Sequence, residues 1–297
     1  MKPEVTPFYH EDTGTWTYIV ADPEAGEAAI VDPVLDFDYK AARTSTESAR
    51  EVLATVRERG YRVPWILETH AHADHLSAAP FLKRELGASV AIGEGIKSVQ
   101  GRFKKLFNLP NEYQPRGAEF DRLFQEGDQF HIGQIEGHLV HTPGHTSDSM
   151  SFVIGDAVFV GDTLFMPDGG TARCDFPGGD AGVLYDSIQK LFALPDETRM
   201  FVCHDYKPGG REPRCETTVG EQKRDNIHVG GNTSREEFAA FRDERDAGLA
   251  MPRLIIPSVQ INMRAGDLPE PAANGIHYLN VPLNQLGREP EGGTGHD

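Results

Sequence analysis

Residues 69–75 read Thr-His-Ala-His-Ala-Asp-His, which places three histidines and one aspartate within six residues. The preceding residues 64–68 are expected to form a short buried strand that runs directly into His70. In an extended segment His70 and His72 project from the same side, while Asp74 and His75 lie where the chain turns toward a helix. One loop therefore offers four metal-binding side chains that can face one cavity from two directions.

Three later motifs contribute the same kinds of side chain. Each closes a strand-like run: Gly144-His145-Thr146, Gly161-Asp162, and Cys203-His204-Asp205-Tyr206. Imidazole and carboxylate ligands together suit zinc or ferrous iron, and the sequence has no thiolate-rich cluster typical of a structural zinc or an iron–sulfur centre. The sequence therefore predicts a metalloenzyme whose site is assembled from distant segments.

Composition narrows the class of partner and the compartment. The chain has 297 residues and a formal net charge of −17, which argues against nucleic acid or an anionic membrane as partner, because both require a basic surface. A small anionic substrate held by a local basic patch is compatible with this charge. No apolar run approaches the roughly 20 residues that span a bilayer, and residues 1–11 lack the features of a signal peptide. The three cysteines, Cys174, Cys203 and Cys215, fit a reducing compartment, so we expect a cytoplasmic protein.

Hydrophobic periodicity predicts mixed strands and helices. A hairpin is expected from residues 16–21 and 28–34, and helical spacing extends over residues 47–59. A second helix is expected from Leu76 to a stop at Gly87, with Asp74 as its N-cap. Further strands are predicted at residues 89–92, 136–140, 149–154, 157–160 and 199–203, and a further helix at residues 183–194. Turn residues between the strands of residues 130–164 indicate consecutive antiparallel pairing.

In their order along the chain, these motifs resemble those of the metallo-β-lactamase superfamily. The segment Thr69 to His75 is followed by Gly144-His145, Gly161-Asp162 and His204, each at a strand end. The resemblance covers about residues 5–230. It implies an α+β fold, a four-layer αββα sandwich with the metal at one edge of two packed sheets. It does not select the reaction, because the superfamily is chemically diverse.

Finer motifs resemble the persulfide dioxygenase branch, which contains the ethylmalonic encephalopathy protein. The motifs are Gly161-Asp162-Thr163-Leu164-Phe165, Arg173-Cys174-Asp175-Phe176, Cys203-His204-Asp205-Tyr206 and Asn262-Met263-Arg264-Ala265-Gly266. The resemblance implies one Fe(II) per chain and the oxidation of glutathione persulfide with O2 to sulfite and glutathione, a reaction of sulfide detoxification.

The same resemblance implies that His70, His145 and Asp162 hold the iron. Two histidines and one carboxylate would leave up to three coordination positions for the persulfide and O2. The remaining side chains of the motifs would orient these ligands or form a vacant second metal site. They are His72, Asp74, His75 and His204.

Other residues near the motifs are candidates for contacts with the substrate. Tyr206 either directs its hydroxyl into the cavity or packs in the core, and Arg173 either pairs with Asp175 or Asp162 or contacts the substrate. Residues 207–224 hold five basic and three acidic side chains, and we expect Arg214 and Lys223 to bind the carboxylates of glutathione. Two cysteines are not expected to react: Cys174 has no assigned base, and Cys203 is expected to be a core thiol.

Two other functions remain open. A dinuclear zinc hydrolase of the glyoxalase II type would use all seven metal ligands on a thioester of glutathione. Against it stand the cysteine-led motif at Cys203 and the lack of a long helical substrate domain. The third function is a non-catalytic metal-binding or sensor protein. For the dioxygenase and for the hydrolase, the expected partners are small molecules, with no nucleic acid and no membrane. A homodimer is also considered for this chain.

The domain division is expected near residue 230. Residues 1–230 form the predicted catalytic domain, and residues 231–297 are expected to add a helix beginning at Ser234, an apolar segment at residues 254–261 and a loop-rich tail. The tail either wraps over the catalytic domain or forms a dimer contact. The Gly/Pro-rich residues 289–297 are predicted to be disordered.

Overall fold

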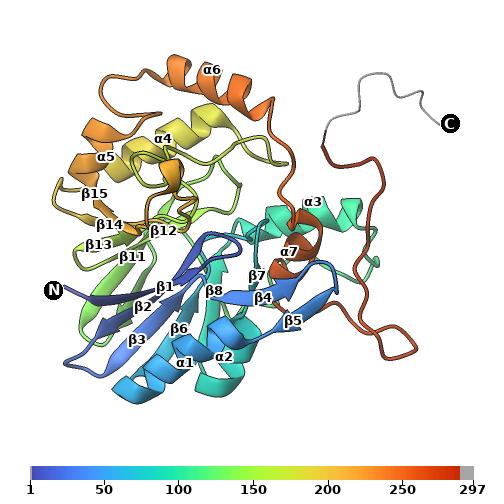
Figure 1. The fold of residues 1–297 in the computed structure, drawn as a ribbon. Helices are drawn as coiled ribbons and strands as arrows, with labels where there is room; N and C mark the ends of the chain where they lie inside the picture. The colour runs from blue at the N-terminus through green and yellow to red at the C-terminus, as the bar shows by residue number, and fades with distance from the viewer. Residues whose placement is uncertain (1, 288–297) are drawn as a thin grey trace.

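The computed structural model describes residues 2–287, which form two six-stranded sheets, a smaller sheet and flanking helices (Figure 1). In spatial order the first sheet contains β1 (Glu4–His10), β2 (Thr15–Asp22), β3 (Glu27–Val31), β6 (Arg62–Leu67), β8 (Ser89–Gly93) and β9 (Arg122–Phe124). The second contains β10 (Gln129–Ile132), β11 (Ile135–His141), β12 (Met150–Ile154), β13 (Ala157–Phe159), β14 (Arg199–Phe201) and β15 (Glu216–Thr218). The small sheet contains β5 (Arg43–Ser45), β4 (Val34–Asp38) and β7 (Leu76–Ser77).

The helices lie on the two outer sides of the paired sheets (Figure 1). On the side of the first sheet are α1 (Glu47–Arg59), α2 (Ala79–Leu86), α3 (Ile96–Leu106) and α7 (Ile255–Asn262). On the side of the second sheet are α4 (Ala181–Phe192), α5 (Val219–Asp225) and α6 (Arg235–Asp246), and a short 3-10 helix covers Pro208–Gly210.

Strand β2 shows why the molecule has four layers. Because side chains alternate along a strand, Ile19 faces the cluster shared with α1, α2 and α3, whereas Tyr18 and Val20 face the second sheet. In the second sheet Phe152 faces the first sheet, and its neighbour Val153 faces α4. Three apolar clusters thus separate four layers, which confirms the predicted α+β αββα sandwich.

Several predicted elements match and one does not. Helix α1 covers the expected residues 47–59. Helix α2, however, begins at Ala79 with Ala78 as N-cap, and residues 76–77 are strand β7. The prediction that Asp74 caps this helix is therefore wrong, because the pairing of β7 with β4 delays the helix start. The Asp74 carboxylate instead faces His204.

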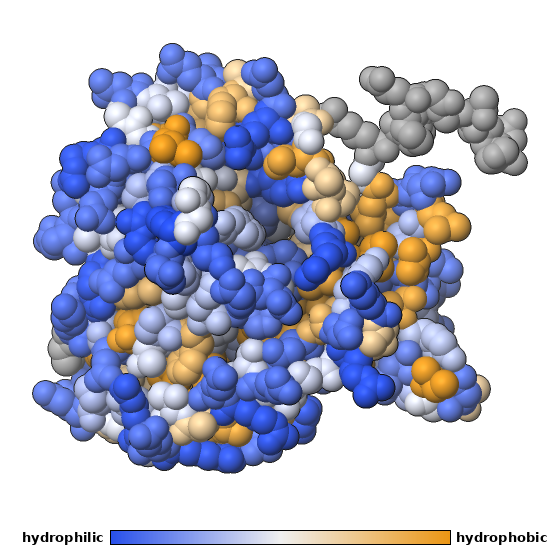
Figure 2. All heavy atoms as spheres, viewed as in Figure 1, coloured by the Kyte–Doolittle hydropathy of each residue, from blue (hydrophilic) through white to orange (hydrophobic). Residues whose placement is uncertain are grey.

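The C-terminal segment contacts both outer layers. Helix α6 packs against α4, and α7 contributes Ile255 and Val259 to the cluster beneath α1 and α2. Pro257 is tolerated in α7 because it lies in the first turn, where its missing N–H has no helical partner. Figure 2 shows apolar side chains gathered on the side of α3, α7 and the C-terminal segment, on a face that is otherwise mostly hydrophilic.

Two predictions about the chain as a whole have different outcomes. None of the helices within residues 2–287 has the length and apolar character needed to cross a bilayer. The predicted disorder of residues 289–297 lies outside the described residues.

Candidate metal centre

The four motifs meet at one edge of the paired sheets. His70 follows β6, His145 lies between β11 and β12, and Asp162 and His204 follow β13 and β14. Backbone contacts between the sheets hold this edge together, because the Trp16 N–H donates to the Cys203 carbonyl (2.7 Å).

Glycines allow two of these loops to approach closely. Gly161 has φ +53°, and a Cβ there would lie 2.7 Å from the Thr69 hydroxyl. Gly144 has φ +132°, and a Cβ there would lie 2.3 Å from the backbone nitrogen of Leu184. Glycine is therefore required before Asp162 and before His145, because any side chain there would collide with Thr69 or with Leu184.

The first group of ligands is the one predicted to hold iron. The Asp162 Oδ2 atom lies 3.8 Å from His70 Nε2 and 3.6 Å from His145 Nε2. One ligand atom from each of these residues lies within 4.8 Å of the others, and all three side chains are buried. These distances leave room for an ion between the three side chains.

The second group consists of the remaining predicted ligands, His72, Asp74, His75 and His204. His204 Nε2 lies 3.0 Å from Asp74 Oδ2 and 3.4 Å from Asp162 Oδ1. The two oxygens of Asp162 thus face the two groups. The structure brings all seven predicted side chains together, and both a one-metal and a two-metal arrangement are geometrically available.

Buried polar atoms without hydrogen-bond partners concentrate here. Within residues 2–287 they include His70 Nε2, His72 Nδ1, Asp74 Oδ2, both ring nitrogens of His75, Asp162 Oδ1 and His204 Nε2. Each such atom costs about 1–3 kcal/mol when buried without a partner. A bound cation would accept lone pairs from those of these nitrogens and oxygens that face the centre, so the site fits a metal ion.

Outer partners orient four of the imidazoles. The contacts are His70 Nδ1 with the Thr69 hydroxyl (3.0 Å), His72 Nε2 with Asp32 Oδ1 (3.0 Å), His145 Nδ1 with the Arg173 carbonyl (2.7 Å) and His204 Nδ1 with the Thr15 hydroxyl (3.3 Å). In each ring one nitrogen is held and the other faces the centre, which is the usual arrangement of metal-binding histidines.

Burial sets the charge state of these ligands. Burial and the neighbouring imidazoles hold the pKa values of His70 and His72 well below the usual range, and burial lowers the pKa of His145 to about 4. These rings are therefore neutral near pH 7 and can donate a lone pair to a metal. Burial raises the pKa of Asp162 to about 7, so a nearby cation would stabilise its ionised form.

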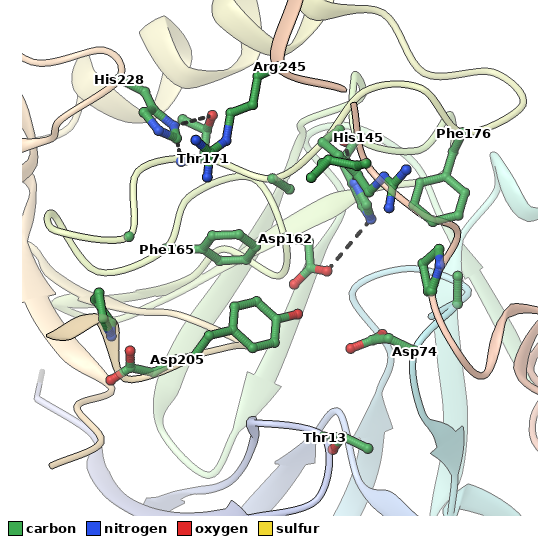
Figure 3. Close-up of a pocket in the computed structure, with 18 of the residues that line it drawn as sticks. Thr13, Asp74, His145, Asp162, Phe165, Thr171, Phe176, Asp205, His228 and Arg245 are labelled. Atoms are coloured by element: carbon green, nitrogen blue, oxygen red, sulfur yellow. Dashed lines mark hydrogen bonds and ion pairs between the residues drawn. The ribbon is translucent and has the colours of Figure 1, made fainter. Parts of the chain in front are cut away.

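A cavity of about 570 Å³ opens onto the site. Figure 3 shows Asp74, His145 and Asp162 around its centre, Phe165 and Phe176 on opposite sides, and Arg245 extending toward it. One end of the cavity is therefore polar and metal-binding, and the walls are aromatic and cationic.

Two of the other predicted site residues line this cavity. The Tyr206 ring stacks on the His204 ring, with centroids 5.6 Å apart and planes 4° apart, and it is 59% exposed, so it belongs to the cavity wall and not to the core. The Arg173 guanidinium donates to both oxygens of Asp175, at 2.6 and 2.7 Å, and to the Ala250 carbonyl (2.6 Å). Arg173 thus braces the loop whose carbonyl contacts His145.

The predicted anion-binding residues Arg214 and Lys223 do not lie on this cavity wall. Arg214 Nη2 contacts Asp168 (3.1 Å), and Lys223 Nζ pairs with Asp196 (2.5 Å) beside a separate cavity. Each of the two cations thus pairs with a carboxylate, and the partner of Arg214, Asp168, itself lines the cavity.

Sequence reasoning missed two other arginines that line the cavity. Arg245, near the end of α6, and Arg253, in the following loop, lie on its wall. Neither has a carboxylate within 4 Å among residues 2–287. Arg245 lies on a helix rich in charged residues, so nothing in the local pattern distinguished it from an exposed surface residue.

Comparisons with known proteins identify the family of this chain. Residues 10–204 match the metallo-β-lactamase superfamily model. A "Beta-lactamase hydrolase-like protein" of Xylella fastidiosa is 50% identical over 284 residues, and the match covers 96% of this chain but only 65% of that protein. "Glyoxylase B2" of Dictyostelium discoideum is 44% identical, with 96% of this chain and 98% of that protein covered.

Similarity also extends to the branch suggested by the finer motifs. The "Persulfide dioxygenase ETHE1, mitochondrial" of Bos taurus is 31% identical over 255 residues, covering 85% of this chain and 84% of that protein. The crystal structure of ETHE1 from Myxococcus xanthus has a TM-score of 0.71 and 32% identity, covering 89% of this chain and 100% of that chain. These two matches support the persulfide dioxygenase branch. Motifs, layers and family model agree, and the chain belongs to the metallo-β-lactamase superfamily.

Proposed function

We propose that this protein is a persulfide dioxygenase that oxidises glutathione persulfide with O2 to sulfite and glutathione, using one Fe(II) per chain. The observation that supports this most directly is the buried group His70, His145 and Asp162, which adjoins an open cavity. Two histidines and one carboxylate with open positions are typical of non-haem Fe(II) oxygenases. The similarity to ETHE1 proteins is the second support.

The reaction balances with water as the third reactant. The S–S bond of the persulfide breaks, O2 accepts four electrons, and water supplies the third oxygen of sulfite, leaving the thiol of glutathione. Ferrous iron supplies the redox chemistry for this step, which zinc does not. The protein residues would hold the iron and position the substrate, and the rings of Phe165 and Phe176 on the cavity wall would exclude bulk water.

The cavity wall suits an anionic thiol compound. Arg245 and Arg253 have no carboxylate partner among the described residues and can pair with the carboxylates of glutathione. We therefore assign to Arg245 and Arg253 the binding of the glutathione carboxylates, the role that the sequence suggested for the basic residues of the segment 207–224. A cytoplasmic location and a homodimer stay predictions from the sequence.

A dinuclear zinc thioester hydrolase is the second candidate. The complete second group of ligands and the position of Asp162 Oδ1 favour it, because both half-sites are built. The name of the relative that is 50% identical, "Beta-lactamase hydrolase-like protein", also points to hydrolysis.

Metal analysis with two activity assays separates the candidates. We expect anaerobically purified protein to contain about one iron per chain and to consume O2 when glutathione persulfide is added. Two zinc ions per chain with hydrolysis of S-lactoylglutathione would support the hydrolase instead. Bound metal with neither activity would indicate a sensor.

Ligand variants provide the residue-level test of the iron site. His70→Ala and Asp162→Ala should lose iron and O2 consumption together, because each removes one of three ligands. His204→Ala should retain much of its iron, since His204 lies in the second group. Equal loss of iron from His70→Ala and His204→Ala, measured by elemental analysis, would show that the one-iron assignment is wrong.

A further inference from the structure

We infer that Asn262, the last residue of α7, is a positioning residue for the metal-binding loop. Its side-chain Nδ2 donates to the backbone carbonyls of His72 (2.8 Å) and His75 (2.7 Å), and its Oδ1 accepts from the Ser77 N–H (2.9 Å). One buried carboxamide, 4% exposed, thus binds the loop backbone at two points and the adjoining strand β7 at a third. This inference rests on the metal site of the proposed function and not on its substrate.

The loop needs such support because it has no regular structure of its own. Residues 68–75 lie between β6 and β7 and take part in no strand pairing. Ordering each free backbone residue costs about 1–2 kcal/mol, so a loop held in place before the metal arrives binds it more tightly. Asp148 holds the same loop from the other side, where its Oδ2 accepts from the Ala71 N–H (2.8 Å).

Asn262 is itself held in position. The Met263 carbonyl accepts from Gln100 Nε2 (2.9 Å), and Gln100 Oε1 accepts from the Gly117 N–H (2.8 Å). Gly266 then packs directly on the loop exit: its φ is +88°, and a Cβ there would lie 2.8 Å from the Ser77 carbonyl oxygen. Residues 262–266 therefore form a fixed support, and the geometry of the metal centre depends on the C-terminal segment.

An amide is required at this position. Both carbonyls need a donor and the Ser77 N–H needs an acceptor, and only Asn or Gln side chains carry both kinds of group in this geometry. An aspartate of the same shape would keep the contact to Ser77 but would place a carboxylate oxygen against two carbonyl oxygens.

The test is a titration of metal-depleted full-length protein with Co²⁺. The visible absorption spectrum of the bound Co²⁺ reports both the Kd and the geometry of the site. For Asn262→Ala we expect a Kd about 10–100 times higher than that of the wild type, the usual effect of losing an outer support of a metal site, and an altered Co²⁺ spectrum. The matched control is Gln260→Ala. Gln260 lies on the same helix and is equally buried, but it contacts Ile256 and Asn280 and not the loop.

The control should stay within about twofold of the wild type in Kd, since the hydrogen bonds from Asn262 to the loop remain intact in that variant. If Asn262→Ala and Gln260→Ala gave the same Kd and the same spectrum as the wild type, the inference would be overturned. This assay uses no substrate, so a failure of O2 consumption would count against the proposed function and leave the inference about Asn262 unaffected.

Asn262→Asp covers the case in which Asn262→Ala does not fold. We expect the rise in Tm on adding Co²⁺ to be smaller for Asn262→Asp than for Gln260→Ala, because only the former disturbs the loop. A variant that lowered the Tm of the metal-free and the Co²⁺-bound protein equally would have a general structural role, and positioning would be disproved.

Discussion

At the scale of single residues, the type of the ligands and their grouping were predictable, and the orientation of their rings was not. The motif residues themselves indicated imidazole and carboxylate ligands, and all seven lie at the centre. Which ring nitrogen faces the metal depends on partners far away in sequence, such as Asp32 for His72 and Thr15 for His204. No local pattern in the sequence identifies such partners.

The cationic wall leads to a prediction about substrate affinity. Replacing both Arg245 and Arg253 by Ala should raise the KM for glutathione persulfide about 10- to 100-fold and change kcat little, because a charge-assisted hydrogen bond contributes about 1.5–3 kcal/mol. The KM of the wild type should also fall as ionic strength is lowered. Steady-state O2 consumption measures both effects.

Lys223→Ala is the control for this prediction, since Lys223 pairs with Asp196 outside the cavity. It should leave the KM unchanged. If the double variant had the KM of the wild type, or if the KM did not depend on ionic strength, Arg245 and Arg253 would not be substrate-binding residues.

His228 leads to a prediction about pH. Burial, followed by the charges of Arg242 and Arg245, lowers its pKa to about 4 from an ordinary value of 6.5, and its Nδ1 accepts from the Thr171 N–H (2.9 Å). Between these two values the unfolded chain binds a proton that the folded protein does not. Stability therefore falls as pH falls through this window, by about 2 kcal/mol at pH 4.5 from this group alone.

His228→Asn should remove this dependence, because an asparagine oxygen can still accept from Thr171 but does not titrate. Urea unfolding of both proteins at pH 7 and pH 4.5 measures it. The stability of the variant relative to the wild type should rise at the lower pH; an unchanged difference between the two proteins would contradict the assignment.

At the scale of secondary-structure elements, strong periodicity predicted well and tertiary pairing overrode it once. Helix α1 matched its expected residues because its apolar side chains recur at helical spacing and Gly60 ends it in a left-handed conformation. Residues 76–77 also fit a helical pattern, but pairing with β4 made them a strand. The apolar segment 254–261 lies in helix α7 (Ile255–Asn262) and its N-cap Leu254, and the last residue of the helix, Asn262, contacts the metal loop.

At the scale of the whole molecule, the metal centre joins both sheets and the C-terminal segment, so metal removal should affect global stability. A ligand present at about 1,000 times its Kd adds about 4 kcal/mol to stability. We therefore expect chelation to lower the Tm by roughly 10 °C, and added Fe(II) to restore it under anaerobic conditions. Differential scanning calorimetry measures this.

The reference is the double variant His70→Ala/Asp162→Ala, whose Tm should not respond to chelator. If the wild type also showed no response, the metal would not be linked to the folding of the molecule.

Local sequence was sufficient for the layers and for the identity of the metal ligands, because strand alternation, helical periodicity and short motifs involve neighbouring residues. The motifs also indicated the family, and with it the sandwich fold. The cationic wall and the support by Asn262 were decided only by the folded chain. Arg245 reaches the cavity from the end of α6, and Asn262 lies 190 residues from His72, whose carbonyl it binds. Packing of whole layers sets such contacts, and no pattern within a helix or strand encodes them.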